Sequence, residues 1–323
     1  MIETIVMPEV PARGADISQS VAIIAEQLAL NKVVGLGEAH WFSAIFEHWQ
    51  SVALHPDVLA QCQDIVLEMG NQKYQQQVDE YTAGSDDVGL QQIRHMLQDS
   101  IVFPVWFAAY YIEFFKAVRQ VNQQRALSKR PLVKLHVMEP DFNWQDVSSH
   151  VDYLTLNAGR DQAFYRYIEK NFISERKPVM AIMGARHLLK VPQSYRIKNV
   201  AQLCEQYYPG RLFSVWPHIF KHKILDNLSL NQRATLLFTN SELLCDLTFK
   251  DVCPMPQKNM PDKTQSDTLL SDQVDAYLMI KGAKREMTVD QYALDNFDTQ
   301  GIIAKATHLH DRQKQLLHKI LLN

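Results

Sequence analysis

The most constraining feature of the sequence is the regular alternation of short apolar runs with longer segments of helical periodicity. Apolar residues recur at helical spacing in 17–30 and 43–54, and the β-branched run 32–36 lies between them. Such a short apolar run predicts a buried strand of a parallel sheet, because helices cover both faces of that kind of sheet. Further strands are predicted at 64–69, 131–138, 178–183, 211–216, 233–238 and 276–280. Further helices are predicted at 71–83, 88–98, 103–124, 160–175, 197–208 and 303–322.

This alternation predicts an α/β fold with a mainly parallel (mixed) sheet and helices on both faces. The 323 residues have the length of one large domain or two smaller ones. We expect a single domain over 1–323, with a helical insertion at about 71–128 that covers the active-site rim. Residues 254–273 contain three prolines and no periodicity. They predict a long loop, and the sequence leaves open whether it is a lid or disordered.

Composition narrows the class of partner. The net charge of −3 provides no broad basic field for nucleic acid. No apolar run reaches the length of about 18 residues that a membrane span needs, and the N-terminus lacks the apolar region of a signal peptide. The four cysteines are sparse and form no C-x-x-C pair, which is typical of a reducing compartment. We therefore expect a cytoplasmic protein whose partner is a small-molecule substrate.

Functional side chains follow four of the predicted strands. The strand ends read Glu38-Ala39-His40, Glu68-Met69-Gly70, Glu139-Pro140-Asp141 and Gly184-Ala185-Arg186-His187. Ligands of open α/β sheets bind outside the carboxyl ends of the strands, so neighbouring parallel strands would bring these groups into one crevice. Carboxylates are costly to bury unless they are paired or used in chemistry. The sequence therefore predicts a site that contains two imidazoles and several carboxylates.

The first strand end also resembles the start of a dinucleotide-binding loop. Gly35 and Gly37 match the first two glycines of G-x-G-x-x-G, but His40 occupies the place of the third. The acid that ends the next strand, Glu68, lies 31 residues after Gly37, against about 20 in that fingerprint. Signatures of a serine nucleophile, a phosphate loop or an H-E-x-x-H zinc site are absent from the sequence. The remaining chemistry is a water activated by histidine, with or without a metal.

The motifs LGEAHW, LEMGNQKYQQQVDEYTAG and GARHL, in this order, resemble the erythromycin-esterase-like and ChaN-like superfamily. The resemblance runs from about residue 33 to 190. The segments FPVW, VRQVN, VMEPD and RDQAFYRYI are similar to the esterase branch. The spacing Gly-Glu-x-His and the glutamine-rich helix after LEM are instead similar to the ChaN-like branch. Both branches stay open at this point.

The esterase resemblance implies hydrolysis of a carboxylic ester or lactone without a metal. It implies that His40 is the general base and that Glu38 and Glu68 orient it or hold substrate hydroxyls. It further implies that His187 polarises the ester carbonyl or protonates the leaving alcohol. Two further residues complete the expectation: Arg186 would stabilise the oxyanion, and Asp141 would fix an imidazole tautomer.

Two alternatives remain beside this hypothesis. A metal-dependent hydrolase would use Glu38, His40, Glu68 and His187 as ligands for zinc or manganese. The ChaN-like resemblance implies a haem-binding protein without turnover.

Two residues of the helical insertion are also candidates for substrate binding. Arg94 is expected to reach the rim. Trp106 belongs to the aromatic run 103–115, which is a core stripe or the wall of an apolar pocket.

Overall fold

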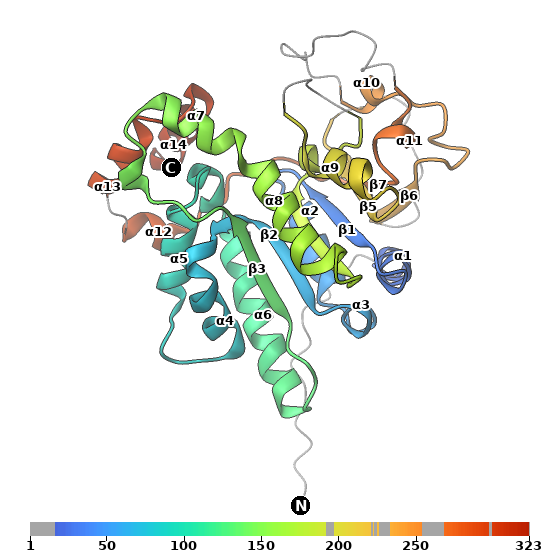
Figure 1. Cartoon of the computed structure of the whole chain (residues 1–323), viewed down its shortest axis with the longest axis horizontal. Helices are drawn as coiled ribbons and strands as arrows, with labels where there is room; N and C mark the ends of the chain where they lie inside the picture. Colours follow the sequence, from blue (N-terminus) through green and yellow to red (C-terminus); the bar gives the residue numbers. More distant parts are fainter. Residues whose placement is uncertain are drawn as a thin grey trace, which may run out of the picture.

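In the part of the chain that the structure describes, seven strands form one sheet in the order β3-β2-β4-β1-β5-β7-β6 (Figure 1). The computed structural model describes residues 17–191, 197–220, 222, 225, 233–253, 268–296 and 299–322. The strands are β1 Val33–Glu38, β2 Asp64–Asn71, β3 Lys134–Glu139, β4 Val179–Gly184, β5 Leu212–Pro217, β6 Ala234–Phe238 and β7 Ala276–Ile280. Every neighbouring pair is parallel except β6 and β7, which are antiparallel. The predicted mainly parallel, mixed sheet is confirmed.

The central strands are buried on both faces, as their continuous apolar runs predict. Along β4, Met180 and Ile182 enter the larger core cluster, whereas Val179, Ala181 and Met183 enter a second cluster. Because side chains alternate along a strand, the two clusters lie on opposite faces of the sheet. The first cluster receives side chains from α1 (Ser18–Ala29), α2 (Ser43–Ala53) and α6 (Ala109–Leu127), and the second from α8 (Arg160–Ile168) and α9 (Val200–Tyr207). Figure 1 shows this three-layer arrangement.

The helices in the described part of the chain begin and end as follows. They are α1 Ser18–Ala29, α2 Ser43–Ala53, α3 Pro56–Gln61, α4 Gln75–Ala83, α5 Leu90–Gln98, α6 Ala109–Leu127, α7 His150–Ala158, α8 Arg160–Ile168, α9 Val200–Tyr207, α10 Phe249–Val252, α11 Leu270–Gln273, α12 Gln291–Asp295, α13 Thr299–Ala306 and α14 Asp311–Leu321. Short 3₁₀ turns are η1 Gln72–Tyr74, η2 Phe103–Phe107, η3 Trp144–Asp146 and η5 Ala185–Leu188, and Glu169–Ile173 is a π-helical turn, η4. None of these helices combines the length and the apolar character needed to cross a membrane.

The segment between β2 and β3 differs from its prediction in one place. The expected helix over 103–124 is two elements, η2 and α6, separated by the extended residue Ala108. Ala108 pairs with Val289 in an antiparallel bridge, and this tertiary contact overrides the helical periodicity. Trp106 therefore lies on η2, which precedes α6 in the sequence, whereas Tyr110 lies on α6.

Other boundaries also depend on local signals. The expected helix 303–322 is divided into α13 and α14, and α14 begins after His310. Helix α3 is short and has Pro56 at its first turn, where the missing N–H costs nothing. In the predicted loop 254–273, residues 254–267 lie outside the described residues, and α11 occupies its last four positions.

Gly37, in β1, lies close to the backbone of β5. A Cβ atom at this position would overlap the carbonyl oxygen of Val215 and come within 3.1 Å of Ala185 Cβ. Since backbone atoms cannot move aside, Gly37→Ala is expected to destabilise the protein by about 1–3 kcal/mol or more, as overpacked cores do. Urea unfolding measures this change.

A matched control is Gly159→Ala, whose added Cβ meets its nearest atom, Leu156 O, at an ordinary 3.5 Å. The free energy of unfolding of that control should stay within about 0.5 kcal/mol of the wild type. Equal stabilities of the two variants would contradict the assignment of Gly37 to this close contact.

Candidate active site

The carboxyl ends of four neighbouring strands meet at one edge of the sheet. Glu139 ends β3, Glu68 lies in β2, His187 follows β4, and Glu38 ends β1 two residues before His40. These four strands are consecutive in the sheet order β3-β2-β4-β1. The predicted convergence of the strand ends is confirmed.

Glu68 lies between the two histidines. Its Oε2 is 2.8 Å from His187 Nε2, and its Oε1 is 3.5 Å from His40 Nε2. The pairing of β2 with β3 shifts register between Leu67 and Asn71, so Glu68 sits in an irregular stretch of the kind that redirects side chains beside active sites. Burial alone would raise the pKa of this carboxyl. The nearby His187, His40 and Arg160 outweigh that effect and lower the pKa to about 2.

His187 is held on both of its ring nitrogens. Nδ1 lies 2.7 Å from Asp161 Oδ1, while Nε2 faces Glu68. Asp161, in the first turn of α8, also accepts a hydrogen bond of 3.1 Å from the Val200 amide, at the start of α9. Burial opposes the charged imidazole, but the two carboxylates outweigh it and raise the pKa of His187 to about 10. At neutral pH this ring is therefore a fixed cation.

His40 is the more accessible of the two imidazoles. Its side chain is 32% exposed, against 18% for His187. Nδ1 lies 3.2 Å from Glu38 Oε1 and 3.3 Å from the Tyr111 hydroxyl, and the ring packs edge-on against Trp106. Burial works to lower the pKa of His40, but the Glu38 and Glu68 carboxylates outweigh it, so the pKa is raised. Burial also raises the pKa of Glu38.

A further ion pair, between Arg160 and Glu139, lies next to Glu68. Arg160 Nη2 is 3.2 Å from Glu139 Oε1 and donates a hydrogen bond of 3.4 Å to the backbone carbonyl of Glu68. Glu139 Oε2 accepts from the Ile101 amide at 2.7 Å. Burial raises the pKa of Glu139 to about 7, with Arg160 acting in the opposite direction.

The roles predicted for Asp141, which was to fix an imidazole tautomer, and for Arg186, which was to stabilise the oxyanion, do not fit the structure. Asp141 is exposed, and the carboxylate that accepts from His187 Nδ1 belongs to Asp161. Arg186 is also exposed, so the guanidinium that enters the cluster is that of Arg160. In both cases the strand end turns the predicted side chain outward, and helix α8 supplies the partner from another part of the chain.

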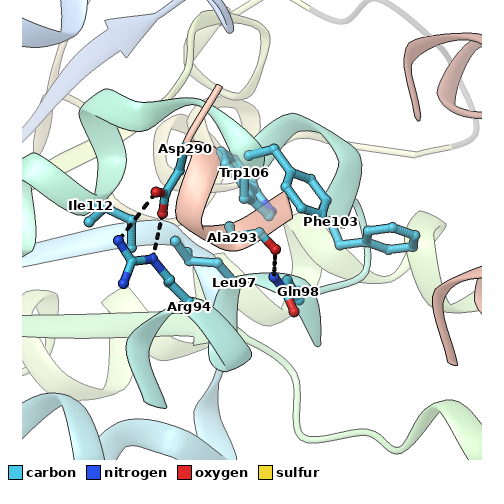
Figure 2. A pocket seen from close by; sticks show the side chains of 9 residues that line it. Arg94, Leu97, Gln98, Phe103, Trp106, Ile112, Asp290 and Ala293 are labelled. Carbon is cyan, nitrogen blue, oxygen red and sulfur yellow. Dashed lines mark hydrogen bonds and ion pairs between the residues drawn. The ribbon is translucent and has the colours of Figure 1, made fainter. Parts of the chain in front are cut away.

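Arg94 and Trp106 line a narrow cavity beside the cluster (Figure 2). Its volume is about 10 Å³, which is room for no more than one water. Arg94 makes a two-pronged ion pair with Asp290, with Nε 2.6 Å from Oδ2 and Nη2 3.2 Å from Oδ1. Of the two predicted substrate-binding residues, the structure therefore brings only Trp106 into contact with His40.

Four residues of the cluster escaped the sequence prediction as site residues: Tyr111, Glu139, Arg160 and Asp161. Arg160 and Asp161 belong to RDQAFYRYI, a segment that the family resemblance had marked. Glu139 ends a predicted strand. It is buried, whereas Asp141, two residues later, is exposed. Tyr111 lies in an aromatic run that periodicity assigns to the core, so no sequence signal singled it out.

Three of the four predicted metal ligands lie close together. The donor atoms of Glu38, His40 and Glu68 are within 4.8 Å of one another. Imidazole and carboxylate donors suit zinc and manganese. His187 is not part of this group. Its two ring nitrogens lie 2.7 and 2.8 Å from Asp161 and Glu68, closer than the His40 nitrogens lie to their carboxylates. The cluster could therefore hold a cation with three protein ligands.

The fold that positions this cluster is the erythromycin-esterase-like/ChaN-like fold. Three solved structures share it at low sequence identity. An erythromycin esterase, EreC, solved as a histidine-to-asparagine mutant in its open conformation, has a TM-score of 0.53 and 14% identity over 85% of this chain and 96% of its own. A Bacillus cereus protein has a TM-score of 0.53 and 11% identity over 86% and 96% of the two chains. A succinoglycan biosynthesis protein has a TM-score of 0.50 and 10% identity over 82% and 91%.

No family model matches the chain, and neither does any curated protein sequence. At these identities the likeness to solved structures establishes the fold alone. The chemistry has to be argued from the side chains.

Proposed function

We propose that the protein hydrolyses a carboxylic ester or lactone with a water activated by His40. The arrangement around the His40 ring carries this proposal. Glu38 holds Nδ1 at 3.2 Å, and Nε2 points toward Glu68 from a partly exposed position at the strand ends. A histidine whose far nitrogen is held by a carboxylate is the usual geometry of a general base. One structure with this fold is named an erythromycin esterase, which supports the choice of reaction class by analogy.

The proposed reaction proceeds in two proton transfers. Water attacks the carbonyl carbon and its proton passes to His40 Nε2. The bond between this carbon and the alkoxy oxygen of the ester then breaks, and the leaving alkoxy oxygen takes the proton from Nε2. The products are a carboxylic acid and an alcohol, and His40 returns to its neutral form.

The other ionised groups have supporting roles in this proposal. Carboxylates lie 2.7 and 2.8 Å from the two nitrogens of His187, against 3.2 and 3.5 Å at His40, and His187 is the less exposed ring. In this proposal His187 therefore holds Glu68 as an anion and does not protonate the leaving group. Glu68 in turn provides an acceptor for the second proton of a water bound at Nε2. His187 therefore acts through Glu68, and this is a different role from the one that the resemblance implied.

The direct test is hydrolysis of p-nitrophenyl esters by the purified protein with and without EDTA. We expect turnover that EDTA leaves unchanged. The three close donors Glu38, His40 and Glu68 favour one other candidate, a metal-dependent hydrolase. Stoichiometric bound metal with activity lost in EDTA would establish that candidate instead. A Soret band with no ester turnover would favour the haem-binding alternative and contradict both hydrolases.

The pH dependence gives a second prediction. Because Glu38 and Glu68 raise the pKa of His40, the neutral base form becomes the major form only at a pH above the ordinary histidine value of about 6.5. We expect kcat/KM to rise with pH and to reach half its maximum above pH 6.5. Glu68→Gln removes one of the two charges, so the midpoint should move to lower pH in whatever activity remains. A midpoint below 6.5 in the wild type would contradict the assignment of His40 as the base.

A further inference from the structure

A chain of hydroxyl groups runs from the backbone amide of Trp41 to the carboxylate of Glu38. The Trp41 amide donates to the Tyr110 hydroxyl at 2.8 Å, and that hydroxyl donates to the Tyr111 hydroxyl at 3.4 Å. The Tyr111 hydroxyl lies 3.0 and 3.1 Å from the two oxygens of Glu38. Both tyrosines are buried in the first turn of α6. The two ends of this hydrogen-bonded series, Trp41 and Glu38, therefore lie after and before His40 in the sequence.

The donor and acceptor chemistry of the two ends gives this chain one direction. The Trp41 amide can only donate, and an ionised Glu38 can only accept. The hydroxyl protons between them are therefore aligned toward Glu38. Tyr111 has a second possible acceptor in His40 Nδ1, at 3.3 Å. A hydrogen bond to a carboxylate is roughly twice as strong as one between neutral groups, so the proton of Tyr111 belongs to Glu38.

We propose that Tyr111 is a positioning residue, which together with Glu38 fixes the proton of the neutral His40 ring on Nδ1. With the Tyr111 proton on Glu38, the groups within reach of Nδ1 are both acceptors: Glu38 Oε1 at 3.2 Å and the Tyr111 oxygen at 3.3 Å. Nε2 faces a single acceptor, Glu68 Oε1, at the longer distance of 3.5 Å. The hydrogen of the neutral ring is therefore placed on Nδ1, where two acceptors lie closer. Nε2 is left with its lone pair on the side of the ring that faces Glu68. The value of this tautomer for catalysis rests on the proposed function, whereas the tautomer itself does not.

The test is nitrogen NMR of the intact protein labelled in its histidines, at a pH at which the His40 ring is neutral. In the wild type we expect the proton on Nδ1. In Glu38→Gln, Tyr111 still donates to the side-chain oxygen, so the amide NH₂ should face Nδ1 and move the ring proton to Nε2. Adding Tyr111→Phe to Glu38→Gln removes the donor that orients the amide. A measurable fraction of the Nδ1-protonated tautomer should then return.

A matched control comes from a second tyrosine–histidine pair. Tyr277 is fully buried, and its hydroxyl lies 2.8 Å from His218 Nδ1. Tyr277→Phe should alter the His218 signals and leave the tautomer of His40 unchanged. If the loss of any buried hydroxyl were enough to change the His40 tautomer, Tyr277→Phe would change it too.

The proposal is overturned if the wild-type ring carries its proton on Nε2, or if Glu38→Gln leaves the proton on Nδ1. It is also overturned if the single and double variants have the same tautomer ratio. Should Glu38→Gln fail to fold, Tyr111→Phe alone remains informative. In this variant the resonance of the proton on His40 Nδ1 should move downfield, because Glu38 no longer accepts from the competing Tyr111 hydroxyl. An unchanged resonance would contradict the proposal. If the tautomers behave as expected but the wild type cleaves no ester, the tyrosine chain stands and the proposed function fails.

Discussion

His40→Asn is expected to lower kcat for ester hydrolysis by about 10²–10⁴-fold, the usual contribution of a general base. Asparagine retains a polar side chain near Glu38 but has no group that takes a proton from water. The fold should be retained, because His40 is partly exposed and lies after the end of β1 rather than in the core. Initial rates with a p-nitrophenyl ester, together with circular dichroism of the same sample, measure both quantities.

The matched control for this experiment is His95→Asn. His95 is an exposed histidine on α5 that packs edge-on against Tyr74. Its replacement should leave kcat unchanged. Near-normal turnover in His40→Asn would show that another group activates the water and would remove the basis of the proposed mechanism.

His187→Ala is expected to destabilise the protein by about 3–5 kcal/mol, as happens when one partner of a buried ion pair is removed. The variant leaves Glu68, which is 1% exposed, without its closest positive partner. Asp161 loses its imidazole partner at the same time. Urea unfolding at neutral pH measures the loss, with Arg186→Ala as the control. Arg186 is the exposed neighbour in the sequence, and its replacement should change stability by no more than about 0.5 kcal/mol.

The pH dependence of this difference follows from the two pKa shifts. A raised pKa of about 10 in the folded state means that the His187 contribution is fully present below its ordinary value of about 6.5 and is lost as the pH rises through 10. The lowered pKa of Glu68 means that its contribution is present above about 4.5 and is lost as the pH falls through about 2. The stability difference between His187→Ala and the wild type should therefore be largest between about pH 4.5 and 6.5. A difference that grows toward pH 10 would contradict the charged state assigned to His187.

The sheet could be predicted from the sequence because each strand carries its own signal. All seven predicted strands are present, since a short run of branched apolar residues between polar segments has few other ways to be buried. The helices could not be predicted correctly where a residue far away in the sequence sets the backbone conformation. Ala108 is extended because it pairs with Val289, and no residue near Ala108 in the sequence indicates this contact.

The candidate site divides in the same way. Glu38, His40, Glu68 and His187 could be predicted because each stands at the end of a predicted strand and parallel strands end at one edge. Asp141 and Arg186 stand at strand ends too, yet both are exposed. The sequence places a residue at the edge of the sheet but does not determine whether its side chain turns inward, because a single residue of turn reverses that direction.

The sequence by itself determined the strands, their polar ends and the family resemblance, since all three are properties of neighbouring residues. Only the tertiary structure decided which charges pair. Asp161 reaches His187 from α8, and Tyr111 reaches Glu38 from α6, over sequence separations of 26 and 73 residues. The ionisation of the cluster depends on these contacts, because in a buried site the nearest opposite charge and the lost hydration set the pKa together.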